Sequence, residues 1–83
     1  MNNTMNVTIM GRLVGTATGW DQSGDTSMQF YDFEPAIGVS VPMDTNLITW
    51  DYLTGTVEFY NHDGTVVLAT KDAIEWMQRV KPA

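Results

Sequence analysis

The sequence predicts an α+β domain in which a small antiparallel β-sheet of about four to six short strands carries one C-terminal amphipathic helix. Short stretches alternate apolar and polar residues with the two-residue period of a strand. Clusters rich in Gly, Asn and Asp separate these stretches and are typical of turns. The last stretch changes to the 3.6-residue period of a helix. A small β-barrel with an appended helix is the alternative architecture.

A β-hairpin is predicted from strands within 55–61 and 64–69. Between them lies Asn61–Gly64, whose Asn and Asp-Gly residues tolerate the positive φ angles of tight turns. A loop with an even number of residues gives the more apolar of the two possible inner faces. The side chains on that face are Val57, Phe59, Val66 and Leu68. Glu58 and Tyr60 then point outward beside Val67.

Residues 71–81 are predicted to form the helix. Thr70 is the expected N-cap, because its hydroxyl can accept a hydrogen bond from a free N–H of the first turn. Pro82 marks the end of the helix. The apolar stripe contains Ala73, Ile74, Trp76, Met77 and Val80. We expect Trp76 and Met77 to fill the core beneath the sheet, as aromatic and large apolar residues at this spacing usually do.

Four further stretches have strand character, and they lie within 5–14, 26–33, 36–41 and 47–53. Gly11 interrupts the first stretch and is interpreted as a bulge or a close backbone contact. The second stretch has apolar residues on both faces, which favours a central strand. Prolines at both ends of the third stretch favour an edge strand. Trp20–Thr26 is expected to be a polar turn or loop.

The length and composition limit what the protein can be. With 83 residues and no Cys, the chain is expected to form a single domain (1–83) without disulfides or thiolate zinc sites. No run is long and apolar enough to span a bilayer, and the N-terminus lacks the features of a signal peptide. We therefore expect a soluble intracellular protein.

The charge is negative and unevenly distributed. The formal net charge is −6, and no Lys or Arg occurs between Leu13 and Thr70. That interval contains Asp21, Asp25, Asp32, Glu34, Asp44, Asp51, Glu58 and Asp63. Nucleic-acid binding depends largely on basic residues that neutralise phosphates, so direct binding of DNA or RNA is not expected. Binding to anionic membranes is disfavoured for the same reason.

The sequence contains no convincing catalytic or metal-binding motif. His62 is the single histidine and lies in the hairpin turn, and the serines lie in no recognised nucleophile motif. Asp21–Asp25 is only loosely similar to a calcium loop, because it lacks the alternating acids and the distant glutamate. We therefore expect neither an enzyme nor a metal or cofactor site. A glycan site on the aromatic residues is a weaker alternative.

Aromatic residues next to carboxylates point instead to protein binding. Tyr and Trp are enriched at binding hot spots, and an acidic rim steers a protein toward a basic partner. The expected partner-binding residues are Asp32, Glu34, Asp44, Trp50, Asp51, Tyr52, Glu58 and Tyr60. Because basic surfaces are common on proteins that bind nucleic acids, one specific version is an inhibitor that occupies a nucleic-acid groove.

In size and charge the chain looks like the small acidic proteins that phages make against host enzymes, including anti-CRISPR and other anti-defence proteins. This resemblance is compositional, involves no residue pattern and assigns no site residues. It implies an inhibitor that acts in the host cytoplasm. The alternative expectation is a virion structural or assembly protein that forms homo-oligomers through exposed strand edges.

Overall fold

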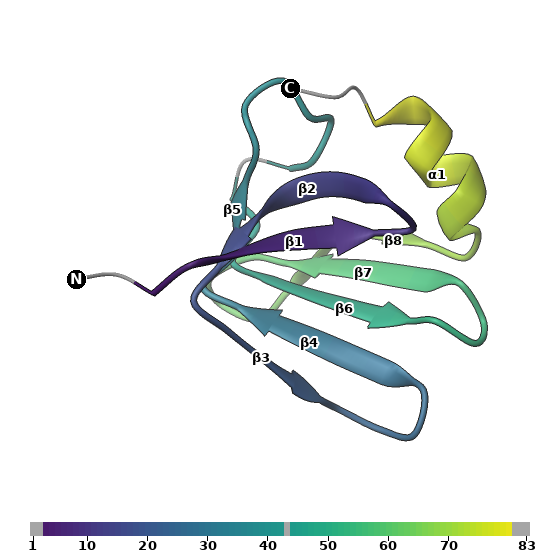
Figure 1. Ribbon diagram of the computed structural model, residues 1–83, viewed down its shortest axis with the longest axis horizontal. Coiled ribbons are helices and arrows are strands. Elements are labelled where there is room, and N and C mark those ends of the chain that lie inside the picture. Colours follow the sequence, from purple (N-terminus) through teal and green to yellow (C-terminus); the bar gives the residue numbers. More distant parts are fainter. Residues whose placement is uncertain (1–2, 43, 81–83) are drawn as a thin grey trace.

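The computed structural model describes residues 3–42 and 44–80 and confirms the α+β class, with two small antiparallel sheets and one C-terminal helix (Figure 1). The strands are β1 Met5–Ile9, β2 Arg12–Ala17, β3 Gly19–Gln22, β4 Ser27–Tyr31, β5 Glu34–Pro35, β6 Leu47–Asp51, β7 Thr56–Tyr60 and β8 Val66–Thr70, and the helix is α1 Ala73–Arg79. One sheet has the order β1-β2-β5, and the other has the order β3-β4-β6-β7-β8. The central position expected for the second strand is confirmed, because β4 pairs with β3 on one side and β6 on the other.

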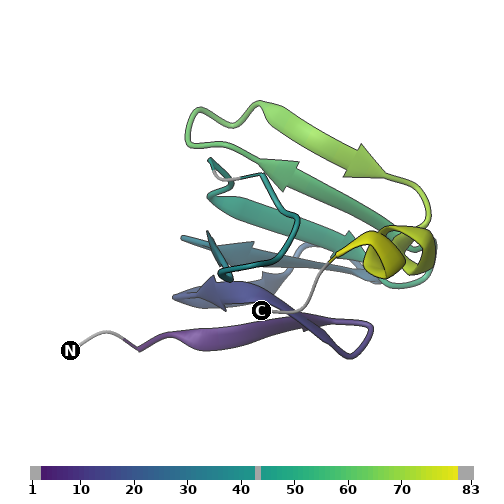
Figure 2. The same ribbon diagram turned by 90° about the horizontal axis from the view of Figure 1, so that it is seen from above.

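The two sheets enclose the core between them, and α1 lies across one end of the strands (Figure 2). The chain passes from one sheet to the other at Thr18, between β2 and β3. The buried apolar residues come from both sheets, from the segment after β5 and from the helix: Val7, Ile9, Val14, Ala17, Phe30, Phe33, Val39, Val41, Ile48, Val57, Phe59, Ala73, Trp76, Met77 and Val80. The expectation that Trp76 and Met77 fill the core is confirmed.

The helix is attached to the body through its buried face and at its C-terminal end. The Trp76 ring packs on Phe59 of β7 with ring centroids 5.1 Å apart. At the C-terminal end, Arg12 Nη1 donates a hydrogen bond of 2.6 Å to the carbonyl oxygen of Val80. Arg12 is the first residue of β2, so this bond joins the start of β2 to the last described residue, Val80.

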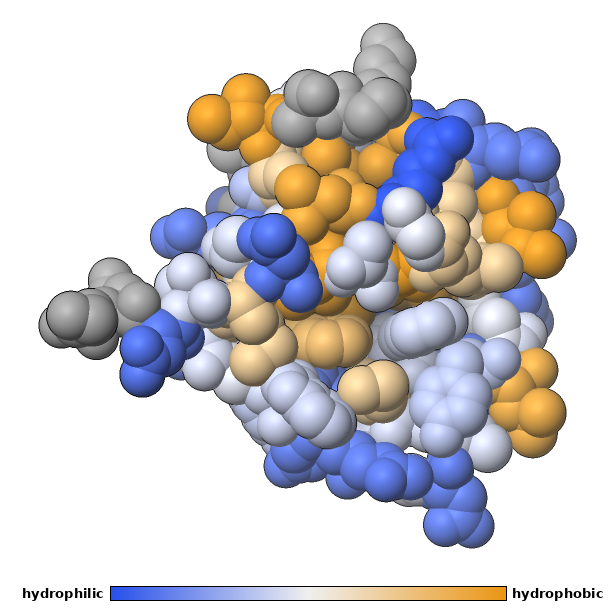
Figure 3. All heavy atoms as spheres, viewed as in Figure 1, coloured by the Kyte–Doolittle hydropathy of each residue, from blue (hydrophilic) through white to orange (hydrophobic). Residues whose placement is uncertain are grey.

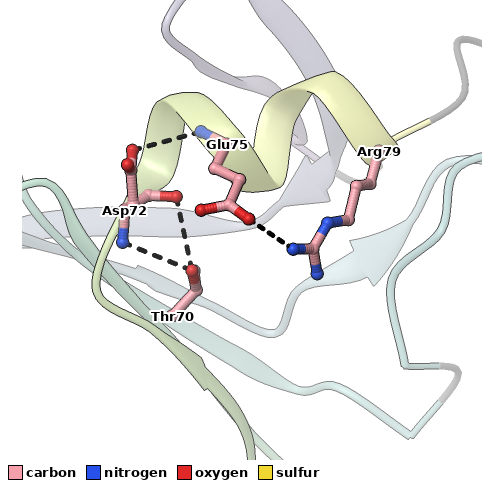
Figure 4. A network of polar contacts seen from close by, with 4 residues as sticks. All are labelled: Thr70, Asp72, Glu75 and Arg79. Carbon is pink, nitrogen blue, oxygen red and sulfur yellow. Dashed lines mark hydrogen bonds and ion pairs between the residues drawn. The ribbon is translucent and has the colours of Figure 1, made fainter.

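The cap of the helix differs from the prediction. Asp72, and not Thr70, is the N-cap, because Asp72 Oδ1 accepts the Glu75 N–H at 3.1 Å (Figure 4). The Thr70 hydroxyl bonds instead to the backbone of Asp72. Ile74 was expected in the buried stripe but is 58% exposed. The predicted helix end at Lys81 and Pro82 lies outside the described residues.

The first predicted strand is in fact a hairpin. Gly11 does not form a bulge but shares a two-residue turn with Met10, and Ile9 pairs with Arg12 across it. Both turn residues have positive φ (52° and 82°), as a type I′ turn requires. Met is a rare residue at such a position, so little in the sequence indicates a turn here.

Two other segments also differ from the prediction. Gly19–Gln22, expected mostly as loop, is the edge strand β3 and pairs with β4. The segment 36–41, expected as an edge strand, is not a strand, although Val39 and Val41 are buried. Only Glu34–Pro35 before it pairs with β2, opposite Gly15 and Thr16. A Cβ atom on Gly15 would overlap the Glu34 carbonyl oxygen and the Phe33 ring, so this close approach needs glycine.

The β7–β8 hairpin has a bulge that the alternation of residues in the sequence did not reveal. Leu68 lies opposite Phe59 and so shares its face, as expected, but Val66 lies opposite Tyr60 because the register shifts between these two pairs. Val66 is consequently on the outer face and 43% exposed, so its expected burial is wrong. The loop runs from Asn61 to Thr65, where Asn61 Oδ1 accepts the N–H groups of Asp63 and Thr65. These hydrogen bonds from the Asn61 side chain stabilise a loop with an odd number of residues, whereas the prediction assumed an even number.

Candidate functional site

The outer face of the five-stranded sheet carries the candidate site. On β4, β6 and β7 the inner residues Phe30, Ile48 and Phe59 are buried, and the residues beside them in sequence point outward. The strand register places four polar side chains in one row across the face, and these are Asp21, Gln29, Thr49 and Glu58. Polar residues also gather along the lower edge of the view in Figure 3, where β3 and β4 lie in Figure 1.

Hydroxyl groups hold two carboxylates of this row in place. Glu58 Oε1 accepts from the Tyr60 hydroxyl at 3.1 Å and from Thr49 Oγ1 at 3.4 Å. The Tyr31 hydroxyl lies 3.1 Å from Asp21 Oδ2 and 2.7 Å from Gln29 Oε1. Partial burial and then the neighbouring Glu58 raise the pKa of Tyr60. The pKa of Tyr31 is raised by desolvation and then by Asp21, so both tyrosines remain protonated hydrogen-bond donors at neutral pH.

The face contains a shallow polar hollow of about 390 Å³. Its lining residues are Ser23, Ser27, Gln29, Thr49, Asp51, Thr54, Thr56, Glu58 and Tyr60. The strands of this sheet contain no Lys, Arg or His. Among residues 3–42 and 44–80, the one salt bridge joins Arg79 and Glu75 on the helix. The carboxylates of the sheet face therefore have no cationic partner within the described chain.

Asp51 lies at the rim of this hollow and also stabilises the β6–β7 turn. Its Oδ1 accepts the N–H groups of Leu53 and Thr54, both at 3.0 Å, and the Thr26 hydroxyl at 3.2 Å. The hydrogen bond from the Thr54 N–H is the main cause of the lowered pKa of the Asp51 carboxyl. Its charge thus contributes to the face, while one of its oxygens is already used by the fold.

Three other predicted contact residues lie at the opposite end of the strands. Asp32 and Glu34 follow β4 and line a hollow of about 360 Å³ that also includes His62. Asp44 lines a smaller one of about 230 Å³, again with His62 and with Asp63. The structure therefore separates Asp32, Glu34 and Asp44 from Asp51, because β6 runs from the first group to the second.

The two remaining aromatic residues do not lie on the polar face. Trp50 points inward and packs against the core, and its ring meets that of Tyr52 edge-on at 5.9 Å. Tyr52 is exposed in the β6–β7 turn, where its hydroxyl donates to the Asp25 carbonyl oxygen at 2.9 Å. Both line a fourth hollow of about 420 Å³ at the helix end of the sheet.

Several residues of these surfaces were missed by the sequence analysis. Asp21 was assigned to a loop, so its place in the row beside Gln29 was not foreseen. Tyr31 was not among the predicted contact residues and was not linked to Asp21. The alternating pattern that reveals Glu58 and Tyr60 is absent from β3, where Trp20 is itself half exposed. Only the pairing with β4 brings Asp21 to the site.

Nothing in the described residues suggests a metal centre or a membrane span. No group of three or more His, Asp or Glu side chains in this part of the chain is placed to hold a metal ion. Within the same residues, no helix has the length and apolar character needed to cross a bilayer. Comparisons with protein-family models, with curated proteins and with solved structures find no match for this chain.

Proposed function

We propose that this protein is a non-enzymatic protein-binding module that presents the outer face of its five-stranded sheet to a basic surface of another protein. The specific form that we favour is an inhibitor of the phage type, including anti-CRISPR-like proteins, that occupies a nucleic-acid-binding groove of a host protein. The carboxylates then take positions that phosphates take in the natural complex.

One observation carries this proposal. Asp21, Asp51 and Glu58 lie on one sheet face with no cationic side chain of the described chain near enough to form a salt bridge. Unpaired charges of one sign create a field that attracts an oppositely charged surface and raises the association rate. Charges that only improved solubility would not need to be fixed by hydroxyl groups, as Glu58 is by Tyr60.

The tyrosines of the face can supply contact area. Tyr31 is exposed at the outer side of β4, and Tyr60 lies partly buried beside Glu58 on β7. Tyrosine buries a large ring at low conformational cost and is enriched among residues that dominate binding energy. A basic partner would therefore find charge and stackable rings on the same surface, which suits arginine in particular.

The experiment is a pull-down from nuclease-treated host lysate at about 50 mM and about 500 mM salt, followed by titration of the captured protein. We expect a stoichiometric basic partner that elutes at high salt and that nucleic acid displaces in competition. Glu58→Lys should weaken binding at least about tenfold, whereas Glu75→Lys, which changes the net charge equally on the helix, should not.

Equal loss of affinity in the two variants would mean that only net charge matters and would contradict a defined site. A complex that is indifferent to salt would also contradict the proposal. Recovery of the bait alone, or of particle proteins, would favour the alternative of a structural subunit that self-associates.

A further inference from the structure

A cluster of exposed apolar side chains surrounds the hollow of about 420 Å³ at the helix end of the sheet. Met10 comes from the β1–β2 turn, Tyr52 and Leu53 from the β6–β7 turn, and Ile74 from the first turn of α1. Leu53 is 75% exposed, Ile74 58%, and Met10 and Tyr52 48% each. Three separate segments therefore present large apolar side chains to solvent at one place, which marks an interaction surface.

This hollow differs from the other three in charge. Its only charged lining residues are Lys71 and Asp72, which sum to zero. The hollow on the sheet face is lined by Asp51 and Glu58, and the two at the opposite end contain acids with His62 as their one basic residue. On a chain of net charge −6, two copies repel unless they meet through an uncharged or self-complementary patch. This patch is both apolar and neutral.

The backbone of Met10 provides independent support. Met10 occupies a turn position with φ 52°, where Asn or Gly would be accommodated with less strain. A strained residue is retained where its side chain has a use, and the side chain of Met10 lines the hollow without being buried in the core. The turn therefore keeps an apolar group at this surface at some cost to local stability.

We propose that this hollow is the contact surface for a second copy of the chain. A two-fold interface uses the same patch on both copies, so the patch must be complementary to itself. The patch has a projecting side chain, Leu53, next to a hollow that can receive it, and it has one cation and one anion on its rim. In the dimer, Leu53 of each copy enters the hollow of the other, and Lys71 of each copy faces Asp72 of the other.

The dimer should be weak. The hollow is lined by ten residues. A stable interface typically uses about 20–30 residues on each side, so this set alone is small. We expect a dissociation constant on the order of 0.1 mM and rapid exchange. The contact leaves the middle of the polar sheet face free for another partner.

Sedimentation velocity on the full chain, from about 10 μM to about 1 mM, tests this proposal around that dissociation constant. The wild type should shift from monomer to dimer over this range. Leu53→Asp should remain monomeric throughout. Ile37→Asp is the matched control, because Ile37 is 91% exposed, more than Leu53, but does not line the hollow. It should dimerise as the wild type does.

The variant Met10→Asn distinguishes a role of Met10 in dimerisation from a role in the stability of the monomer. Asn is favoured at a type I′ turn position, so the melting temperature of the monomer should rise, while the dissociation constant of the dimer should increase at least about threefold. A purely structural role for Met10 would not produce these opposite changes. Glu58→Lys should leave dimerisation unchanged, since Glu58 lies on the other face.

Two results would overturn the proposal. One is a wild-type chain that stays monomeric at about 1 mM, well above the expected dissociation constant. The other is a dimer that survives Leu53→Asp and Ile74→Asp but is lost in Val66→Asp. That pattern would assign the contact to the edge of β8, where Val66 and Val67 are exposed.

Discussion

The two faces of the five-stranded sheet are built by the same strands but differ in the interactions that their side chains make. On the inner face, Ile48, Val57 and Phe59 are completely buried and make apolar contacts in the core. On the outer face, Thr49, Glu58 and Tyr60 form specific hydrogen bonds between side chains. The inner face stabilises the fold through apolar area, whereas the outer face positions charge. Substitutions should therefore affect stability on one face and binding on the other.

The largest effect is expected on the inner face. Phe59→Ala removes a fully buried ring that contacts Trp76 of the helix and should reduce the free energy of unfolding by about 3–5 kcal/mol. Tyr60→Phe, the next residue on the outer face, should cost only about 0.5–1.5 kcal/mol, because it loses one partly exposed hydrogen bond. Urea denaturation of both variants measures the difference. Similar losses would show that the two faces are not distinct in this way.

Gly15→Ala extends the comparison to the smaller sheet and should give the next largest effect. The added methyl group would overlap backbone and ring atoms of Glu34 and Phe33, so the β2–β5 pair must separate. We expect a loss of about 1–3 kcal/mol, measured by thermal or urea unfolding. Gly64→Ala is a useful control, since a methyl group there meets nothing within 4 Å and the cost comes from the positive φ alone. A smaller loss at Gly15 than at Gly64 would contradict the steric argument.

The smallest effect concerns Asp51, which belongs to the outer surface but supports the fold. Its pKa is lowered in the folded state, chiefly by the Thr54 N–H, so its charged form stabilises the protein. This contribution is fully present above the unfolded pKa of about 3.9 and is lost as the pH falls through the lower folded pKa. Asp51→Asn should therefore weaken the fall in stability toward acid pH. The melting temperature measured between about pH 6 and pH 3 tests this expectation.

Asp63 provides the comparison for this measurement. Its pKa is also lowered, by the hydroxyl and the N–H of Thr65, so Asp63→Asn should flatten the curve in the same direction. A variant at Asp51 with the same pH dependence as the wild type would show that the turn does not depend on the carboxylate.

The helix and the inner face could be predicted from the sequence because burial imposes a regular period. Trp76 and Met77 on the helix, and Val57 and Phe59 on the strand, follow periods that few other structures share. The β1–β2 turn could not be predicted, since Met10 gives no sign of a positive φ. The bulge beside Val66 depends on side-chain hydrogen bonds in the loop. Counting the residues between the two strands does not take these bonds into account.

The candidate site was predicted only in part for a related reason. Glu58 and Tyr60 alternate with core residues and so reveal their outward direction. Asp21 gave no such sign, because the edge strand β3 has little apolar alternation and becomes a strand through its pairing with β4. The grouping of Asp32, Glu34 and Asp44 around His62 is set by where loops meet at one end of the strands.

The hydrogen bond from Arg12 to the carbonyl oxygen of Val80 has a consequence for synthesis of the protein. It connects residues 68 positions apart, and the helix between them supplies Trp76 and Met77 to the core. A growing chain that lacks the helix leaves the end of the core that Trp76 and Met77 fill open to water. We therefore expect the core to pack stably only once the helix has left the ribosome, and the exposed apolar side chains to favour aggregation until then.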